Sequence, residues 1–157
     1  MKLSIKKGFG FGVTSGVITT LGLIVGLNSS TGSVLVVTGG IMIIAIADAM
    51  SDALGIHVSE EFENVHKDKE IWAATIMTFL SKFVFAAIFI IPFLLFSLSM
   101  AIKISIVGGL SVIVIFSYLM AKSYQKNPIK VVFEHLLIAE LVIIFTHCIG
   151  DWVSVYI

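Results

Sequence analysis

The sequence predicts an all-α, polytopic membrane protein with one domain covering residues 1–157. Mean hydropathy is +1.09 and 58% of the residues are hydrophobic, above the roughly 45–50% that is typical of soluble domains. Apolar stretches of about 20 residues recur, which is the length that a helix needs to cross a bilayer. The formal net charge is zero. We therefore expect the chain to lie in a lipid bilayer and not to bind nucleic acid.

Five membrane spans are expected, with the N-terminus in the cytoplasm and the C-terminus outside. At 1.5 Å per residue, each apolar stretch is long enough to cross the hydrocarbon core. The spans cover approximately residues 8–27, 33–55, 71–96, 104–121 and 131–153. Residues 57–70 form the only long polar stretch, which we expect to be a short cytoplasmic helix or loop. Pro92 should kink the third span, because proline cannot donate a backbone hydrogen bond.

The lysines determine this orientation. Cytoplasmic loops of membrane proteins carry an excess of positive residues. Only Lys103 falls on the opposite side, and Lys82 falls inside the third span. The other eight of the ten lysines fall on the side assigned to the cytoplasm: Lys2, Lys6, Lys7, Lys67, Lys69, Lys122, Lys126 and Lys130. The small size and the lack of a targeting segment favour a prokaryotic plasma membrane.

The first span is rich in glycine. Gly12 with Gly16, and Gly22 with Gly26, form small-xxx-small pairs that allow helix backbones to approach closely. We expect these pairs to pack helices, either within the chain or in a homodimer. The hydroxyls of Ser15 and Thr19 could line a transport path, although such groups in membrane helices often bond the local backbone instead.

Two carboxylates interrupt the apolar second span. Asp48 and Asp52 are four residues apart, so they share one helix face. Charged groups inside a membrane are costly, and they usually mark an ion pathway or a charge pair. These residues are therefore candidates for cation binding, with Met50 as a softer ligand between them. The alternatives are a pair with Lys82 or, for Asp52, a place at the cytoplasmic interface.

The polar segment contains a second candidate metal site. Glu60 and Glu63 are three residues apart, as are Glu63 and His66, so each of these two pairs shares a face if the segment is helical. The Glu-x-x-His spacing is used by carboxylate–histidine metal sites in helical bundles. A solvated helix with a Glu63–Lys67 pair at i,i+4 is the alternative explanation.

The fifth span carries Glu140, His147 and Asp151. Their spacing of seven and then four residues places them on one stripe of the helix. Such a stripe could relay protons or cations across the membrane. Alternatively, Glu140 forms a neutralising charge pair with Lys82, which we expect at a similar depth.

Nearly the whole chain, in residues 15–26, 47–55, 59–63, 72–95 and 127–150, resembles the vacuolar iron transporter family of nodulin-like iron and manganese transporters. Residues 15–26 resemble the first-helix motif of that family, although Ser15 replaces the usual aspartate. Residues 47–55 resemble the second-helix motif, but Ile56 replaces the glutamate that normally follows it. Residues 59–63 are similar to the Ser-x-x-x-Glu sequence farther along. The chain thus resembles a short member that lacks the large cytoplasmic metal-binding insert.

The resemblance implies a homodimer that exports iron(II) or manganese(II) from the cytoplasm in exchange for protons. The metal is then cargo, and no resident cofactor is expected. The chain is not expected to be an enzyme, because Asp48 and Asp52 lack the second nearby helix that an aspartyl dyad would need. The alternative function is a non-transporting membrane assembly protein that has lost metal transport.

Overall fold

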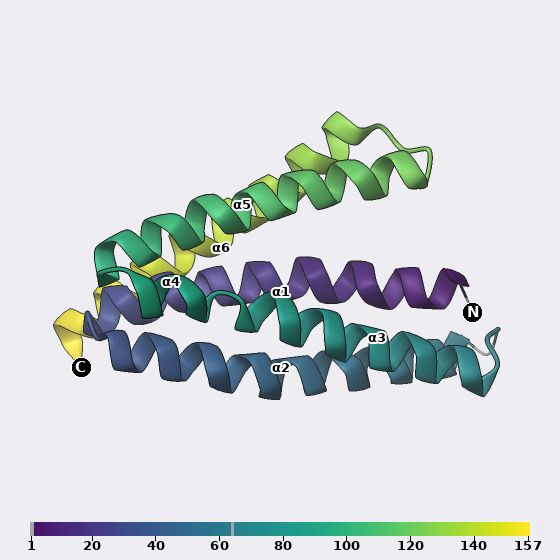
Figure 1. Cartoon of the computed structure of the whole chain (residues 1–157), viewed down its shortest axis with the longest axis horizontal. Helices are drawn as coiled ribbons and strands as arrows, with labels where there is room; N and C mark the ends of the chain where they lie inside the picture. The colour runs from purple at the N-terminus through teal and green to yellow at the C-terminus, as the bar shows by residue number, and fades with distance from the viewer. Residues whose placement is uncertain (1, 64) are drawn as a thin grey trace.

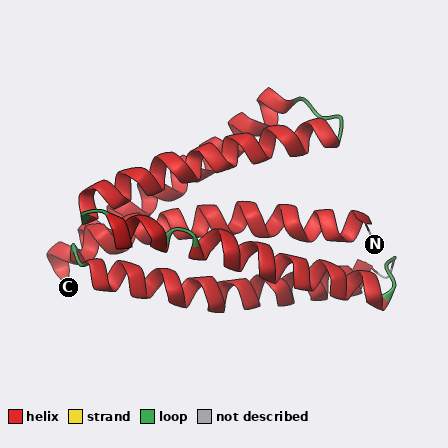
Figure 2. Cartoon of the chain, in the orientation of Figure 1, coloured by secondary structure: helices red, strands yellow, loops and turns green. Residues whose placement is uncertain are grey.

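The computed structural model describes residues 2–63 and 65–157, and these ranges contain helices but no β-strand (Figure 2). This confirms the all-α class. Residue 64, which belongs to the expected polar segment 57–70, lies outside the described residues. The helices are α1 (Lys2–Thr31), α2 (Val34–Glu63), α3 (Asp68–Ala87), α4 (Ile90–Leu95), α5 (Leu98–Ser123) and α6 (Pro128–Tyr156).

Helix α1 lies at the centre of the bundle, in contact with α2, α3, α5 and α6 (Figure 1). Helices α2 and α3 lie on one side of it, whereas α5 and α6 form a hairpin on the other side. The hairpin diverges from α1 toward the end of the bundle that holds the N-terminus, and the C-terminus lies at the opposite end (Figure 1). Phe9 of α1 spans part of the opening, with its ring centroid 5.6 Å from that of Phe116 on α5.

Among the described residues, four segments are long and apolar enough to cross a membrane: Leu3–Thr31, Val34–Glu63, Asp68–Leu95 and Leu98–Ser123. Large apolar side chains cover the outward faces of these helices. Leu35, Ile43 and Leu94, for example, are 81%, 69% and 73% exposed. Such extensive apolar exposure is rare on soluble monomers and supports a multi-pass membrane protein. The fifth expected span, 131–153, lies within α6, which is not among the four.

The helices extend beyond the apolar stretches that predicted them. Helix α2 continues to Glu63, so the first half of the polar segment is part of this helix. Helix α5 begins at Leu98 and includes Lys103, which we had expected to precede the span. The end of an apolar stretch marks where lipid contact ends, whereas a helix continues until the backbone is interrupted. Helix α6 has such a boundary at Asn127, whose side chain accepts from the N–H of Ile129, one residue after Pro128.

The third expected span is broken rather than merely kinked. Helix α3 ends at Ala87, residues 88–89 form a turn, and α4 then continues in the same general direction (Figure 1). Pro92 explains this position, since its nitrogen cannot donate to the Ile88 carbonyl and its ring would crowd that group. The Ile91 N–H instead donates to the Ile88 carbonyl over 3.2 Å.

Glycines on two faces of α1 allow the central packing. A Cβ on Gly12 would lie 2.0 Å from Ser81 Oγ and 2.7 Å from a backbone oxygen of α3. A Cβ on Gly16 would lie 3.0 Å from the carbonyl oxygen of Lys82. On another face, a Cβ on Gly22 would lie 2.7 Å from Val142, and one on Gly26 would lie 3.3 Å from the carbonyl oxygen of Thr146, both on α6. All four glycines thus make helix–helix contacts within the chain.

We predict that Gly12→Ala destabilises the protein by about 1–3 kcal/mol, as overpacking a tight contact commonly does. Gly39→Ala is the matched control, because a Cβ there would meet no atom within 4 Å. The control should gain up to about 1 kcal/mol, since alanine favours helix more than glycine does. Unfolding in detergent, followed by circular dichroism, measures both effects. Equal shifts in the two variants would contradict the close approach of α1 and α3.

Candidate functional site

A group of four polar residues lies between α1, α2 and α3, and we call it the central cluster: Ser15, Asp48, Asp52 and Lys82. The Lys82 side chain is only 1% exposed. Its ammonium group lies 2.5 Å from Asp48 Oδ2 and also forms an ion pair with Asp52 Oδ2. Lys82 Nζ donates to Ser15 Oγ over 2.9 Å, and Ser15 in turn donates to Asp52 over 2.7 Å. One cation is therefore surrounded by three oxygens from two helices.

Helix geometry brings these residues to one depth. Asp48 lies 15 residues before the end of α2, and Lys82 lies 14 residues after the start of α3. At 1.5 Å per residue, both lie about 21–22 Å from the shared end of the two helices. Gly16 allows α3 to approach, because a Cβ there would lie 3.2 Å from the Cα of Lys82. The long side chain of Lys82 can then reach past α1 to the carboxylates of α2.

The central cluster has the oxygen ligands that a divalent metal favours. Two carboxylates and a hydroxyl suit a hard or borderline cation such as manganese(II) or iron(II). The carboxylates of Asp48 and Asp52 remain 28% and 22% exposed, whereas the lysine is almost fully buried. With all three side chains ionised, the two aspartates outnumber the single ammonium and the cluster carries one net negative charge.

A second polar group lies at the end of the bundle where α2 ends, and we call it the end cluster: Lys7, Glu60, Glu63 and His66. Ligand atoms of Glu60, Glu63 and His66 lie within 4.8 Å of one another. His66 Nδ1 is 2.7 Å from Glu60 Oε2, although the Glu60 side chain is fully buried. Lys7 forms ion pairs with Glu60 and, at 3.2 Å, with Glu63. The cluster thus combines three candidate metal ligands with a lysine that already partly neutralises them.

Met50, which the sequence suggested as a ligand between the two aspartates, lies outside both clusters. It lies on α2 between the two aspartates but on another face, where it is 61% exposed. There it borders an apolar groove with His57 and Trp72. A residue two positions from each aspartate is turned about 200° from both, so its thioether cannot face the same point.

The expected pair of Lys82 with Glu140 does not form. Lys82 contacts the two aspartates of α2 instead, and Glu140 lies exposed on α6, beside Leu110 and Val114 of α5. The depth of the two residues is similar, but α3 and α6 pack on different faces of α1. The lysine side chain is therefore directed away from α6.

The remaining residues of the expected path lie apart from the central cluster. The Thr19 hydroxyl donates to the carbonyl oxygen of Ser15 over 2.8 Å, which is a local backbone bond. His147 Nδ1 lies 3.5 Å from Asp151 Oδ1, and both side chains are exposed near the C-terminal end. His147 also contacts Ser29 Oγ of α1. Ser29, His147 and Asp151 thus form a separate polar contact between α1 and α6.

Sequence reasoning missed two partners, Lys7 and Ser29. Both lie on α1, at the ends nearest to Glu60 and His147 respectively. The only available signal was position along the chain. The expected spans place Lys7 at the same end of the bundle as Glu60, and Ser29 at the same end as His147. That signal gives depth but not the face of α1 on which the side chain lies.

We predict that Lys82→Met destabilises the protein by about 3–5 kcal/mol, because it leaves two carboxylates without their buried counter-ion. Lys103→Met is the control, since Lys103 is exposed, and it should change stability by less than about 0.5 kcal/mol. Chemical unfolding in micelles measures the difference. A comparable loss in the two variants would show that the central cluster does not stabilise the bundle.

Comparisons with protein-family models, curated proteins and solved structures gave no match to this chain.

Proposed function

We propose that this chain is a secondary transporter that moves a divalent metal, iron(II) or manganese(II), out of the cytoplasm in exchange for protons. The observation that carries the proposal is the placement of both clusters on α2. Asp52 and Glu60 are eight residues apart, about 12 Å along the helix axis. Glu60 is buried and Asp52 is partly buried, so one helix offers acidic groups at the end of the bundle and again at mid-depth.

The route follows from the order of these groups. Metal is first bound by Glu60, Glu63 and His66, whose ligand atoms already lie within 4.8 Å of one another. It then passes to Asp52 and Asp48. Carboxylates and histidine bind metal only when deprotonated, so protons and metal compete for these groups, and this competition couples the two fluxes.

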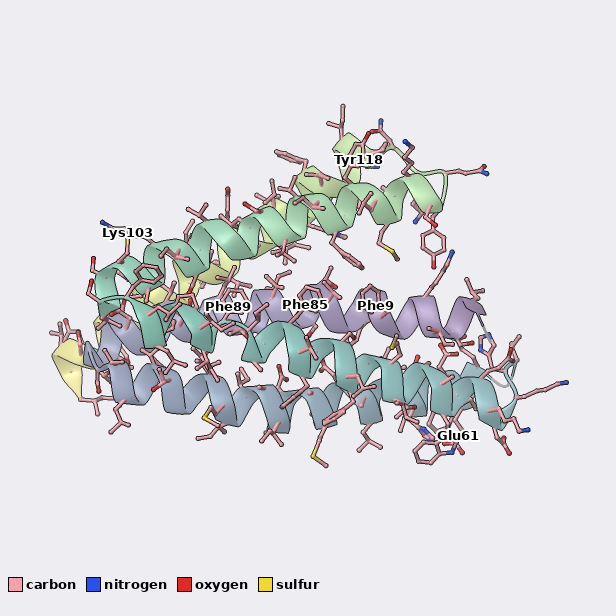
Figure 3. All side chains as sticks on the ribbon, in the orientation of Figure 1. Phe9, Glu61, Phe85, Phe89, Lys103 and Tyr118 are labelled. Atoms are coloured by element: carbon pink, nitrogen blue, oxygen red, sulfur yellow. The ribbon has the colours of Figure 1, made fainter. Side chains whose placement is uncertain are left out.

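The topology proposed for this transporter has five crossings, with α6 as the fifth and the N-terminus in the cytoplasm. The lysine distribution supports this orientation. Lys103 lies at the end of the bundle opposite Glu61 (Figure 3), whereas the lysines that favour the cytoplasm lie at the end where α1 begins. A prokaryotic plasma membrane remains the proposed location.

The resemblance to vacuolar iron transporters supports both the cargo and a homodimer. Ser15, which stands where that family has aspartate, contacts Asp52 and Lys82. The carboxylate missing at Ser15 is thus replaced by the pair on α2. Because the four glycines of α1 pack against α3 and α6, a dimer would use other faces.

The alternative is a non-transporting membrane assembly protein, and one observation favours it. Each cluster contains a lysine: Lys82 pairs with both aspartates, and Lys7 pairs with Glu60 and Glu63. Ion pairs of this kind can hold helices together without binding any metal. This function predicts a stable protein that carries no metal flux.

We predict that Asp48→Asn abolishes manganese(II) uptake into inside-out proteoliposomes that are supplied with a pH gradient. Met50→Leu is the control, because Met50 lies on another face of α2, and it should retain wild-type uptake. Iron(II) and zinc(II) are assayed in parallel. Unchanged uptake in Asp48→Asn would overturn the assigned path. Absence of flux in folded wild-type protein for all three metals would favour the assembly function.

We also predict that Glu60→Gln raises the KM for manganese(II) about tenfold, a loss of about 1.4 kcal/mol of binding energy. Glu60 is fully buried beside His66, whereas the neighbouring Glu61 is exposed and is not one of the residues of the end cluster. Glu61→Gln should therefore leave KM unchanged. Initial uptake rates over a range of metal concentrations measure both variants, and equal KM values would exclude the end cluster from metal capture.

A further inference from the structure

The ammonium group of Lys82 lies where a metal bound to the central cluster would have to lie. Nζ is 2.5 Å from Asp48 Oδ2 and 2.9 Å from Ser15 Oγ, and it also contacts Asp52 Oδ2. Oxygen ligands surround bound divalent cations at about 2.0–2.6 Å. A metal could therefore use the same three oxygens after only small movements, but it could not do so with the ammonium group in place.

The central cluster contains more negative charge than is required to neutralise Lys82. One aspartate would neutralise the lysine, and the second leaves an excess charge at a depth where charge is costly. The two carboxylates are also the more accessible partners, at 28% and 22% exposed, whereas the lysine is 1% exposed. A cation that approaches the cluster from its exposed side would therefore meet the aspartates before the ammonium group.

A divalent ion can displace this ammonium group. At equal distance it attracts each carboxylate twice as strongly as a single charge does. The ammonium group is carried on a flexible four-carbon chain, so it can move away without movement of the α3 backbone. Displacement nevertheless breaks two ion pairs, which weakens the net binding of the metal.

We propose that Lys82 is a built-in competitor that occupies the cation position of the central cluster and sets its metal affinity. This inference rests on the proposed function, because it concerns the same site. Its consequence is that removing the positive charge, although it destabilises the bundle, turns Asp48 and Asp52 into a tighter metal site.

Manganese(II) binding to the full-length protein in detergent tests the proposal, with the bound ion measured by equilibrium dialysis and electron paramagnetic resonance. All variants carry Glu60→Gln and Glu63→Gln, so that the end cluster does not contribute. Adding Lys82→Met should tighten binding at least tenfold, and adding Asp48→Asn and Asp52→Asn to it should remove that gain. Lys103→Met should bind like the parent. Unchanged affinity in Lys82→Met, or a gain that survives loss of both aspartates, would overturn the proposal.

If Lys82→Met does not fold, a variant with the same net charge as the wild-type cluster tests the proposal instead. The pair Lys82→Met with Asp52→Asn keeps the single net negative charge of the wild-type cluster. It should still bind manganese(II) more tightly than the parent, through Asp48 and the remaining oxygens. Binding no tighter than that of the parent would overturn the proposal in this background.

Flux through the wild-type protein is measured separately, so the two ideas can fail independently. If the wild-type protein carries metal but removing Lys82 does not tighten metal binding, the proposal that Lys82 competes with metal is wrong and the transport function still holds. If removing Lys82 tightens metal binding but the wild-type protein carries no metal, competition by Lys82 still holds and the transport function is wrong.

Discussion

The ion pairs of Lys82 with Asp48 and Asp52 are the interaction on which the packing of the first three helices depends. They join α2 to α3, and Ser15 adds α1 through its bonds to both charges. The contact is possible only because glycines on α1 allow α3 to lie close enough for the lysine to reach across. Charge and close packing thus require each other here: without Gly16, α3 would lie too far away, and without the aspartates a buried ammonium group would be too costly.

The same ion pairs connect stability with binding. A cation that binds Asp48 and Asp52 replaces the ion pairs between α2 and α3, so its binding removes part of the interaction that holds these two helices together. A purely structural charge pair would need only one carboxylate. The second aspartate of the central cluster supports the proposed cation transport, as do the three candidate ligands Glu60, Glu63 and His66.

The sequence predicted positions along each helix and which residues of one helix share a face, but it did not predict which neighbouring helix that face meets. The four-residue spacing of Asp48 and Asp52 placed both on one face, and both meet Lys82. Glu60 and His66 also lie together, but α2 ends at Glu63, so helical spacing does not account for this contact. In contrast, Lys82 and Glu140 were matched by depth alone and lie on different sides of α1. Met50 was included because of its chemistry, although its helical position already turned it away.

The sequence also predicted the ends of the helices less well than their positions. Apolar stretches predicted where lipid contact begins and ends, but backbone effects set the true boundaries. Helix α2 therefore runs into the polar segment, and the break at residues 88–89 precedes Pro92 by one turn because the ring acts on the carbonyl of Ile88. Such effects depend on backbone geometry that hydropathy does not describe.

The short connection between α1 and α2 determines how far different parts of α2 move when the angle between the two helices changes. Only residues 32 and 33 separate these helices, and Gly32 adopts a left-handed conformation with φ of 58°. The two helices are thus held close together at this end, whereas, in the part of the chain that the structure describes, no such short connection joins their other ends. At 1.5 Å per residue, Asp48 lies about 21 Å and Glu60 about 39 Å from the start of α2. A small angular opening about this connection would move Glu60 nearly twice as far as Asp48. The ion pair of Glu60 with Lys7 on α1 would therefore separate before the hydrogen bond of Asp52 with Ser15 on α1, which lies closer to the connection.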